Sequence, residues 1–397
     1  MQTDEQTASC IDSLEASQRD EPSETGELTT ADGPFLKNVF APMKHFILKP
    51  AGGGGPELKL YDAMKSPDRQ LIKAGYFVAE GSLVIQQILK LCPTYRIASI
   101  LSTEAQLRKL APELAEADAA YTALASPSSS STAVTADAVT TADAATAADA
   151  ATADDPPCVV FAGGRADVSS ATGFKHSALS ILAIIRRPAH AHMPLASWLP
   201  TLKPAPGTRR PTLLVLDSVI KPENVGALFR TALAFGVCGV LLSPGCADPL
   251  YRKAIRASMG GCFKLPYLHA NDWPNDLDQL RAGVGGVAGY KTFALHLQGS
   301  MPHDEAIAAA AAGAGPSSAG PSAGGDGATG SHVASEVAPI AVMVGAEYEG
   351  VSDAAAALAD VRVRIPMSDA MEGSLDSLNV NVAAAIVLER VFAGNRA

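Results

Sequence analysis

The chain has 397 residues, enough for two domains with buried cores, and 47% of them are hydrophobic, as in an ordinary globular protein. It contains no run of about 18 apolar residues, so the sequence predicts no transmembrane span and no membrane partner. The formal net charge is −10, which argues against a nucleic-acid partner until the distribution of the charges is considered.

Charge is divided unevenly along the chain. Residues 1–34 hold nine acids and one base, and residues 133–155 hold five Asp and no base. Residues 201–270 hold nine Lys or Arg against three acids, a balance of about +6. This pattern fits acidic tracts attached to a body that binds RNA or phosphate, although charge alone equally allows a solvated basic surface.

The cysteines give no sign of a metal site. They are Cys10, Cys92, Cys158, Cys238, Cys246 and Cys262, without a Cys-x-x-Cys pair or a nearby histidine cluster. A zinc site or a disulfide framework is therefore not expected, and a reducing interior is favoured. The N-terminus lacks a signal-peptide core and is too acidic for a transit peptide, so we expect a soluble cytoplasmic protein, with a chloroplast or mitochondrial location left open.

Changes in composition divide the chain into segments. The tracts at 126–157 and 306–338 are rich in Ala, Ser, Thr, Gly or Asp and predict low-complexity insertions. The Gly run "AGGGGPE" is not followed by a strand-then-helix pattern, which favours a flexible linker. The predicted order is a disordered tail and Gly linker (1–57), an N-terminal domain (58–190), a Pro-rich linker (191–210) and a C-terminal domain (211–397).

In the N-terminal domain, apolar runs alternate with helical patterns. Strands are expected at 75–81, 96–103 and 158–164, with a further apolar run at 177–188 closing the domain. A helix is expected at 82–92, with Ser82 at its cap position.

In the C-terminal domain, the same alternation continues with more strongly apolar strands. Strands are expected at 212–219, 238–244, 262–267, 287–297, 339–347 and 360–367. Helices are expected at 224–236, 249–261, 276–282 and 377–393. This order predicts a parallel α/β sheet covered on both faces, with ligands bound at the carboxyl ends of the strands.

Polar residues follow two of these strands. In "KPENVGALFR" Asn224 can cap the next helix, and Arg230 lies six residues further on. In "VGAEYEGVS" two glycines bracket Glu347 and Glu349, which permits a turn against a ligand. A helix cap with a surface arginine, and an ordinary strand-to-helix turn, are the structural alternatives.

A third polar stretch precedes the last helix, in "SLDSLNVNVAAAIVLERV". Ser377 is a plausible N-cap, whereas Asn379 is less easily explained by structure alone. The helix would bury one apolar face, formed by Val380, Ala383, Val387, Leu388 and Val391.

Taken in order, five segments resemble the successive motifs of the SpoU-type (TrmH-like) RNA 2′-O-ribose methyltransferases of the SPOUT superfamily. They are "LDSVIKPENVGALFRTALAFG", "DPLYRKAIRASMGGCFKLP", "GAEYEGVS", "IPM" and "DSLNVNVAAAI". "RQLIKAGYFVAEGSLVIQQIL" and "ATGFKHSALSILAIIRRP" are similar to the ribosomal-protein-like α/β RNA-binding domain that precedes the catalytic domain. The resemblance covers about residues 58–125, 158–190 and 210–395.

The resemblance implies a C-terminal parallel-sheet domain with a deep trefoil knot, an S-adenosylmethionine cofactor and an obligate homodimer. Gly345, Ile365 and Leu378 match positions that contact the cofactor. The residues that match catalytic positions are Asn224, Arg230, Glu347, Ser377 and Asn379. The substrate would be ribosomal or transfer RNA, with ribosomal RNA slightly favoured, and DNA would be excluded because it lacks the 2′-hydroxyl.

Family accounts often name the arginine as the base. A guanidinium has donors and no acceptor, so Arg230 could equally bind a phosphate and stabilise a developing alkoxide. The sequence departs from the family pattern at Ala346, at Tyr348 and in the length of 366–377, which affects substrate placement more than chemistry.

Three other functions fit the sequence less well. A catalytically inactive RNA-binding relative should have lost the polar site residues, which are all present. A dinucleotide-binding oxidoreductase needs a Gly-x-Gly-x-x-Gly pattern after its first strand, and "LDSVIKPENVGALFR" lacks it. Methylation of a base nitrogen on the same fold is disfavoured by the "SLN" stretch.

Overall fold

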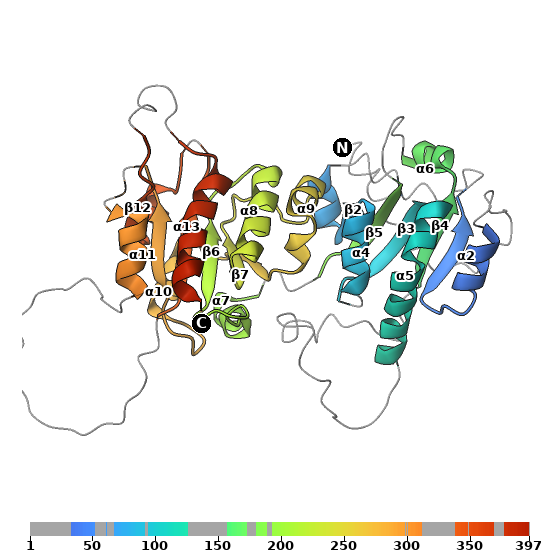
Figure 1. Cartoon of the computed structure of the whole chain (residues 1–397), viewed down its shortest axis with the longest axis horizontal. Coiled ribbons are helices and arrows are strands. Elements are labelled where there is room, and N and C mark those ends of the chain that lie inside the picture. Colours follow the sequence, from blue (N-terminus) through green and yellow to red (C-terminus); the bar gives the residue numbers. More distant parts are fainter. Residues whose placement is uncertain are drawn as a thin grey trace, which may run out of the picture. The chain divides into compact units, whose positions relative to one another are not determined.

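The computed structural model forms two compact units (Figure 1). Unit 1 contains Met1–His190 and Asp248–Phe263, and unit 2 contains Ala191–Ala247 and Lys264–Ala397. The residues described are 33–51, 61, 67–91, 94–125, 157–172, 180–188, 193–297, 299, 301–311, 338–347, 349–368 and 377–396. The predicted tail before residue 33, most of the Gly linker, and the predicted insertions over 126–156 and 312–337 lie outside these ranges.

Unit 1 is built on a mixed five-stranded sheet of order β1-β4-β3-β5-β2. Its strands are β1 (Phe46–Pro50), β2 (Tyr76–Glu80), β3 (Ile97–Thr103), β4 (Cys158–Gly163) and β5 (Ile181–Arg186). Its helices are α2 (Gly33–Phe40), α3 (Asp68–Lys73), α4 (Ser82–Lys90), α5 (Glu104–Ala125), α6 (Arg165–Thr172) and α9 (Arg252–Ser258). Strands β1, β3 and β4 are parallel to one another, whereas β5 is antiparallel to both β3 and β2.

The predicted strands of unit 1 are confirmed, with one correction at a helix start. Helix α4 begins at Ser82 and its cap residue is Gly81, so Ser82 is the first helical residue rather than the cap. Gly81 has φ +90°, a conformation that glycine adopts without strain.

Unit 2 is built on a seven-stranded sheet of order β10-β12-β9-β11-β6-β7-β8. Its strands are β6 (Thr212–Leu216), β7 (Gly239–Leu242), β8 (Tyr267–His269), β9 (Lys291–Leu295), β10 (Met301–Pro302), β11 (Ile340–Val344) and β12 (Val361–Arg364). Its helices are α7 (Leu195–Trp198), α8 (Pro222–Ala234), α10 (Asn275–Ala282), α11 (His303–Ala311), α12 (Asp353–Leu358) and α13 (Val380–Asn395). All of its strand pairs are parallel, which confirms the predicted parallel α/β sheet.

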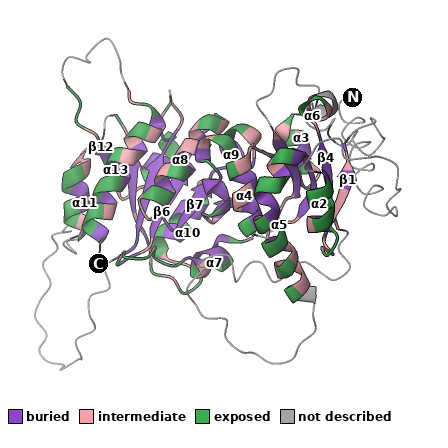
Figure 2. Cartoon of the chain, turned by 45° about the vertical axis from the view of Figure 1, so that its right-hand side comes forward, coloured by how far each residue is buried: buried purple, intermediate pink, exposed green. Residues whose placement is uncertain are grey.

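The central strands of unit 2 are buried on both faces, as Figure 2 shows by their purple colour. Side chains alternate between faces, and Leu213, Val215 and Met343 pack with α7, α10 and α12 in one core cluster. Helices α8 and α13 pack against each other, and α13 also packs on β11. Strands as apolar as β6 and β11 need this double cover, because any exposed face would leave their side chains in water.

Helix α13 runs from the carboxyl edge of the sheet to its amino edge. At its end, Asn395 accepts from the Arg210 N–H at 3.0 Å and donates to the Arg210 carbonyl at 2.8 Å, just before β6 begins. At its start, Asn379 donates to Glu347, which follows the end of β11. The helix therefore carries its first residues to the edge where the strands end.

Three predicted irregular segments contain ordered structure. The predicted tail and Gly linker, residues 1–57, contain α2 and β1, whose side chains Leu36 and Phe46 are buried. Within the predicted linker 191–210, the residues Leu195, Trp198 and Leu199 are buried in the core of unit 2. The predicted insertion 306–338 begins inside α11, which continues to Ala311.

One predicted strand is wrong. Residues 262–267 do not form a strand; Gly261–Phe263 is a 3₁₀ helix, and β8 begins only at Tyr267. The aromatic ring of Phe263 stacks on Phe77 of unit 1, with centroids 5.8 Å apart, so a distant contact overrides the local apolar pattern. Within the described ranges, no helix is long and apolar enough to cross a membrane.

Candidate active site

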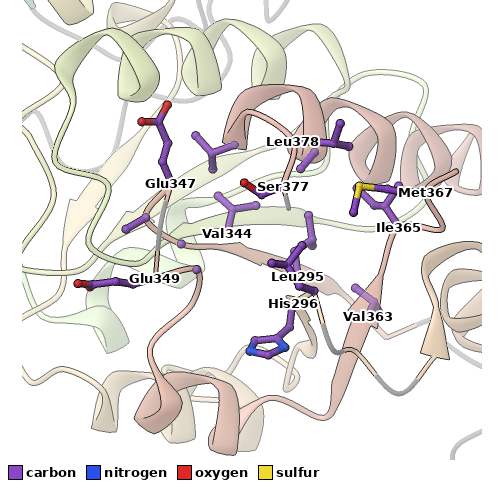
Figure 3. Close-up of a pocket in the computed structure, with 16 residues that line it drawn as sticks. Leu295, His296, Val344, Glu347, Glu349, Val363, Ile365, Met367, Ser377 and Leu378 are labelled. Carbon is purple, nitrogen blue, oxygen red and sulfur yellow. The ribbon is translucent and has the colours of Figure 1, made fainter. Parts of the chain in front are cut away.

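A cavity of about 370 Å³ opens at the carboxyl edge of the unit 2 sheet (Figure 3). Its walls come from the ends of β9, β11 and β12 and from the segment that leads into α13. Cavities of about 300–1,000 Å³ are typical of sites for small molecules and cofactors. The cavity lies where the sequence predicted a ligand, since open parallel sheets bind ligands beyond their strand ends.

The three residues predicted to contact a cofactor, Gly345, Ile365 and Leu378, all line this one cavity. Leu295 and Val344 add apolar surface from the ends of two neighbouring strands, as Figure 3 shows. These residues lie far apart in the sequence, and the parallel sheet brings them together. The walls are therefore suited to a ligand with a flat or aliphatic apolar part.

Gly345 occupies a position that no larger residue fits. A Cβ atom placed on it would lie 1.9 Å from the carbonyl carbon and oxygen of Gly350. The backbone after β11 thus folds back on itself, closed by the Gly350 N–H, which donates to the Ala346 carbonyl at 2.9 Å. This close approach of two backbone segments shapes one wall of the cavity.

Glu347 is the meeting point of three hydrogen-bond donors. Its Oε1 accepts from Asn224 Nδ2 at 2.9 Å and from Asn379 Nδ2 at 3.3 Å, and its Oε2 accepts from Lys221 Nζ. The hydrogen bonds from Lys221 and Asn224, with a smaller contribution from Asn379, lower the pKa of the Glu347 carboxyl below its ordinary value. A carboxylate held in this way is a weak base, so it serves better as an anchor for amides than as a proton acceptor.

Two predicted helix caps need correction. Helix α8 begins at Pro222 with Lys221 as its cap residue, because proline is well suited to the first helical position. Asn224 therefore lies in the first turn and does not cap the helix. At α13 the cap is Asn379, whose Oδ1 accepts from the Asn381 N–H at 3.0 Å; the predicted cap, Ser377, instead lines the cavity.

Arg230 does not join the other predicted catalytic residues. It is exposed on α8 and does not line the cavity, whereas Glu347 and Ser377 do. Asn224 and Asn379 do not line the cavity themselves, but their side-chain amides donate to Glu347, which does. The structure thus brings four of the five predicted residues together within one chain.

Asp217 is a supporting residue whose role the sequence did not reveal. It is 1% exposed, and its Oδ2 accepts from the Ser352 N–H at 2.8 Å. Ser352 is in turn the N-cap of α12, accepting from the Ala355 N–H. Asp217 therefore fixes the far end of the turn that carries Gly345 and Glu347.

None of the cysteines that the structure describes lines this cavity. Burial raises the pKa of the Cys238 and Cys262 thiols to about 12, which makes them unreactive at neutral pH. Among the residues that the structure describes, no group of three or more His, Cys, Asp or Glu side chains is arranged to hold a metal ion.

The sequence of unit 2, which contains the cavity, is similar to those of known RNA methyltransferases. Residues 211–389 match the model of the SpoU rRNA Methylase family. An uncharacterized tRNA/rRNA methyltransferase of Mycobacterium tuberculosis is 39% identical over 188 residues, which are 46% of this chain and 53% of that protein. The 23S rRNA (guanosine(2553)-2′-O)-methyltransferase RlmP of Bacillus subtilis is 30% identical over 176 residues, 44% of this chain and 56% of that protein. The chain thus spans little more than half the length of these curated relatives.

Solved structures share the fold across both units. An AdoMet-bound rRNA methyltransferase from Sinorhizobium meliloti superposes with a TM-score of 0.55 at 20% identity, covering 88% of this chain and 98% of that one. The SpoU methyltransferase AviRb from Streptomyces viridochromogenes, in complex with AdoMet, gives a TM-score of 0.54 at 17% identity, covering 85% and 98%. Residues 211–389, the segment that matches the SpoU rRNA Methylase family, contain the cavity and its polar cluster.

Proposed function

We propose that this protein is an S-adenosylmethionine-dependent methyltransferase that methylates a ribose 2′-hydroxyl in structured RNA, with ribosomal RNA favoured over transfer RNA. The observation that carries the proposal is the apolar cavity at the carboxyl edge of unit 2, with the Glu347, Asn224 and Asn379 cluster at its rim. The relatives named as tRNA/rRNA methyltransferases support RNA as the substrate, and RlmP supports the 2′-oxygen of a ribosomal RNA as the target.

The residues present suit this cofactor. Leu295, Ile365 and Leu378 offer apolar surface for an adenine ring and a thioether chain, and the turn at Gly345 exposes backbone for hydrogen bonds. Glu347 and Glu349 are among the residues that line the same cavity, and their negative charges favour a ligand that carries positive charge, as a sulfonium does.

When bound, S-adenosylmethionine supplies an electrophilic methyl group, so the protein has to position and activate the ribose oxygen. With its Nδ2 bonded to Glu347, Asn224 can present its Oδ1 as an acceptor to the 2′-hydroxyl. Arg230 would act as the base or as a donor to a phosphate and a developing alkoxide. The five N–H donors of a guanidinium, and its lack of an acceptor, favour the second role.

The proposal includes a homodimer and a trefoil knot. Exposed apolar side chains on α13 and α8, namely Val382, Ile386 and Leu233, support a second copy as the partner of that surface. A dimer would also give the exposed Arg230 a route to the cavity of the other copy. The knot is what the family resemblance implies.

The test is transfer of labelled methyl from S-adenosylmethionine to total RNA that lacks its natural modifications. We expect incorporation that survives alkali as a resistant ribose linkage, because a methylated 2′-oxygen cannot attack the adjacent phosphate. Arg230→Ala should lower the rate by at least about 10²-fold, the usual effect of removing one transition-state donor. Arg209→Ala, an exposed arginine in the same basic segment, should keep the wild-type rate.

Each other outcome has a distinct meaning. Label in a base rather than a ribose would overturn the 2′-oxygen as the target. Full activity of Arg230→Ala would remove both roles proposed for that residue. Cofactor binding without any transfer to RNA would favour the alternative of a catalytically inactive RNA-binding protein.

A further inference from the structure

Lys221 belongs to the Glu347 cluster although neither the sequence motifs nor the family resemblance assigned it a role. It is the cap residue of α8, five positions after β6 ends, and its Nζ donates to Glu347 Oε2. Asn224 and Asn379 both donate to the other oxygen, Oε1. The two oxygens of one carboxylate are thus divided between a cation and two amides.

This division fixes the direction of the carboxylate. A carboxyl group bonded only through Oε1 could rotate about its last side-chain bond, whereas a partner on each oxygen holds its plane. The donors come from the start of α8 and from the start of α13, two elements that are far apart in the sequence. Lys221 therefore helps to set where the amides of Asn224 and Asn379 point.

Charge gives Lys221 a second effect. The described residues that line the cavity include the acidic Glu347 and Glu349 and no lysine or arginine. A ribose 2′-hydroxyl has an anionic phosphodiester beside it, which these carboxylates would repel. The side chain of Lys221 is 52% exposed, against 22% for Glu347, so its positive charge lies on the solvent side from which RNA must approach.

We propose that Lys221 is a positioning residue of the methyl-transfer site, which holds the Glu347 carboxylate against the amides of Asn224 and Asn379 and offsets its charge toward an incoming RNA phosphate. This role rests on the proposed function, since it assigns Lys221 to the same reaction. The lowered pKa of Glu347 is consistent with it, because the hydrogen bond from Lys221 is the largest contribution to that shift. The other groups acting on this carboxyl are Asn224 and Asn379, and Glu349 shares its turn.

The experiment compares Lys221→Met, which keeps the aliphatic stem, with Lys221→Arg, which restores a cation. Lys203→Met is the matched control, an exposed lysine in the same basic segment. Two readouts are taken on the full chain: methyl transfer as a function of pH and RNA concentration, and titration of the Glu347 carboxyl by ¹³C NMR. The carboxyl signal is assigned with Glu347→Gln, and thermal unfolding of every variant is measured alongside.

We expect Lys221→Met to lower kcat by roughly tenfold, as for loss of a hydrogen bond between charged groups. The Glu347 titration and the acid limb of the rate profile should both move to higher pH. Lys221→Arg should reverse these changes, while Lys203→Met and all unfolding temperatures stay at wild-type values.

A rise in KM for RNA, with kcat and the Glu347 titration unchanged, would overturn the positioning role and make Lys221 a simple phosphate contact. A fall in unfolding temperature that accounts for the lost activity would overturn it as well. The NMR titration needs neither cofactor nor RNA. Failure of the wild type to methylate RNA while the titration shifts would therefore identify the proposed function as the part that fails.

Discussion

At the residue scale, Asn379 combines a structural and a functional contact in one side chain. Its Oδ1 accepts from the Asn381 N–H and begins α13, while its Nδ2 donates to Glu347. The sequence indicated that Asn379 needed an explanation, but it assigned the cap to Ser377. Local pattern alone could not separate these two polar neighbours, because both residue types are good caps and the partner Glu347 lies 32 positions away.

Replacing Asn379 can separate its two roles. Asn379→Ser keeps a cap oxygen and loses the amide donor, so stability should stay within a few tenths of a kcal/mol while methyl transfer falls. Asn379→Ala loses both and should also lower the free energy of unfolding by about 1 kcal/mol. Urea unfolding and methyl-transfer rates measure the two effects. Equal activity in wild type and Asn379→Ser would show that the amide has no part in the reaction.

At the element scale, the turn between β11 and α12 holds the site in shape. Gly345 meets Gly350 at its tightest point, and Asp217 holds the Ser352 end of the turn. The sequence predicted β11, the following turn and the glycines, since their signals are local. It could not reveal Lys221 or Asp217 as partners, because those contacts exist only once β6 and β11 lie side by side.

Two glycine variants test this turn. Gly345→Ala should abolish cofactor binding, because its Cβ would overlap the Gly350 carbonyl and force the turn open. Gly75→Ala, outside the cavity, is the matched control: its φ of +82° costs about 1–2 kcal/mol of strain, yet its Cβ meets nothing within 4 Å. Equilibrium dialysis of labelled S-adenosylmethionine compares them. Equal affinity for both variants would contradict the close approach at Gly345.

A second element-scale prediction concerns Asp360, which ties β9 to α10. Burial alone would raise its pKa, but hydrogen bonds from Thr292 and Arg281 outweigh this and lower it below 3.8. Because the pKa of Asp360 is lower in the folded state, its ionised carboxylate stabilises the fold at pH values above 3.8. This stabilisation is lost as the pH falls through the pKa of the folded state. Asp360→Asn should cost about 1 kcal/mol at neutral pH, and its difference from wild type should shrink in acid.

Urea unfolding measured from pH 6 downwards checks this expectation. Asp278→Asn removes another carboxylate near Arg281, and that side chain is 58% exposed against 18% for Asp360. It should therefore have little effect at any pH. A constant difference between Asp360→Asn and wild type at every pH would contradict the ionic origin of the stabilisation.

At the scale of the whole molecule, the sequence predicted two α/β bodies and missed how the chain is divided between them. The position of residues Asp248–Phe263 in the sequence predicts that they belong to the C-terminal domain. They pack within unit 1, where Arg252 pairs with Asp68 at 2.6 Å and Phe263 stacks on Phe77. Such pairings depend on residues more than 180 positions apart, which no local period can reveal.

Arg210 contacts both ends of the segment predicted as an insertion in the C-terminal domain. Its Nη1 donates to the carbonyls of Ala310 and Ala338 at 3.4 Å each, so those two oxygens lie within twice that distance. A link of about four residues can span such a gap. Replacing residues 312–337 with Gly-Ser-Gly-Ser should leave S-adenosylmethionine affinity and the unfolding temperature unchanged. A large loss of either would mean that the replaced residues contribute to the fold or to the site.

The discontinuous make-up of unit 1 limits how this protein can be dissected. A fragment that stops at His190 would leave Phe77 without the ring of Phe263 and Asp68 without Arg252. A chimera could be made by replacing residues 1–190 with those of a relative at a single junction. Unit 1 would then combine residues 1–190 of the relative with residues 248–263 of this protein, and its buried core would be mismatched. A chimera that keeps both cores intact needs junctions at 190, 247 and 263. Residues 248–263 must therefore come from the same protein as residues 1–190, although their neighbours in the sequence belong to unit 2.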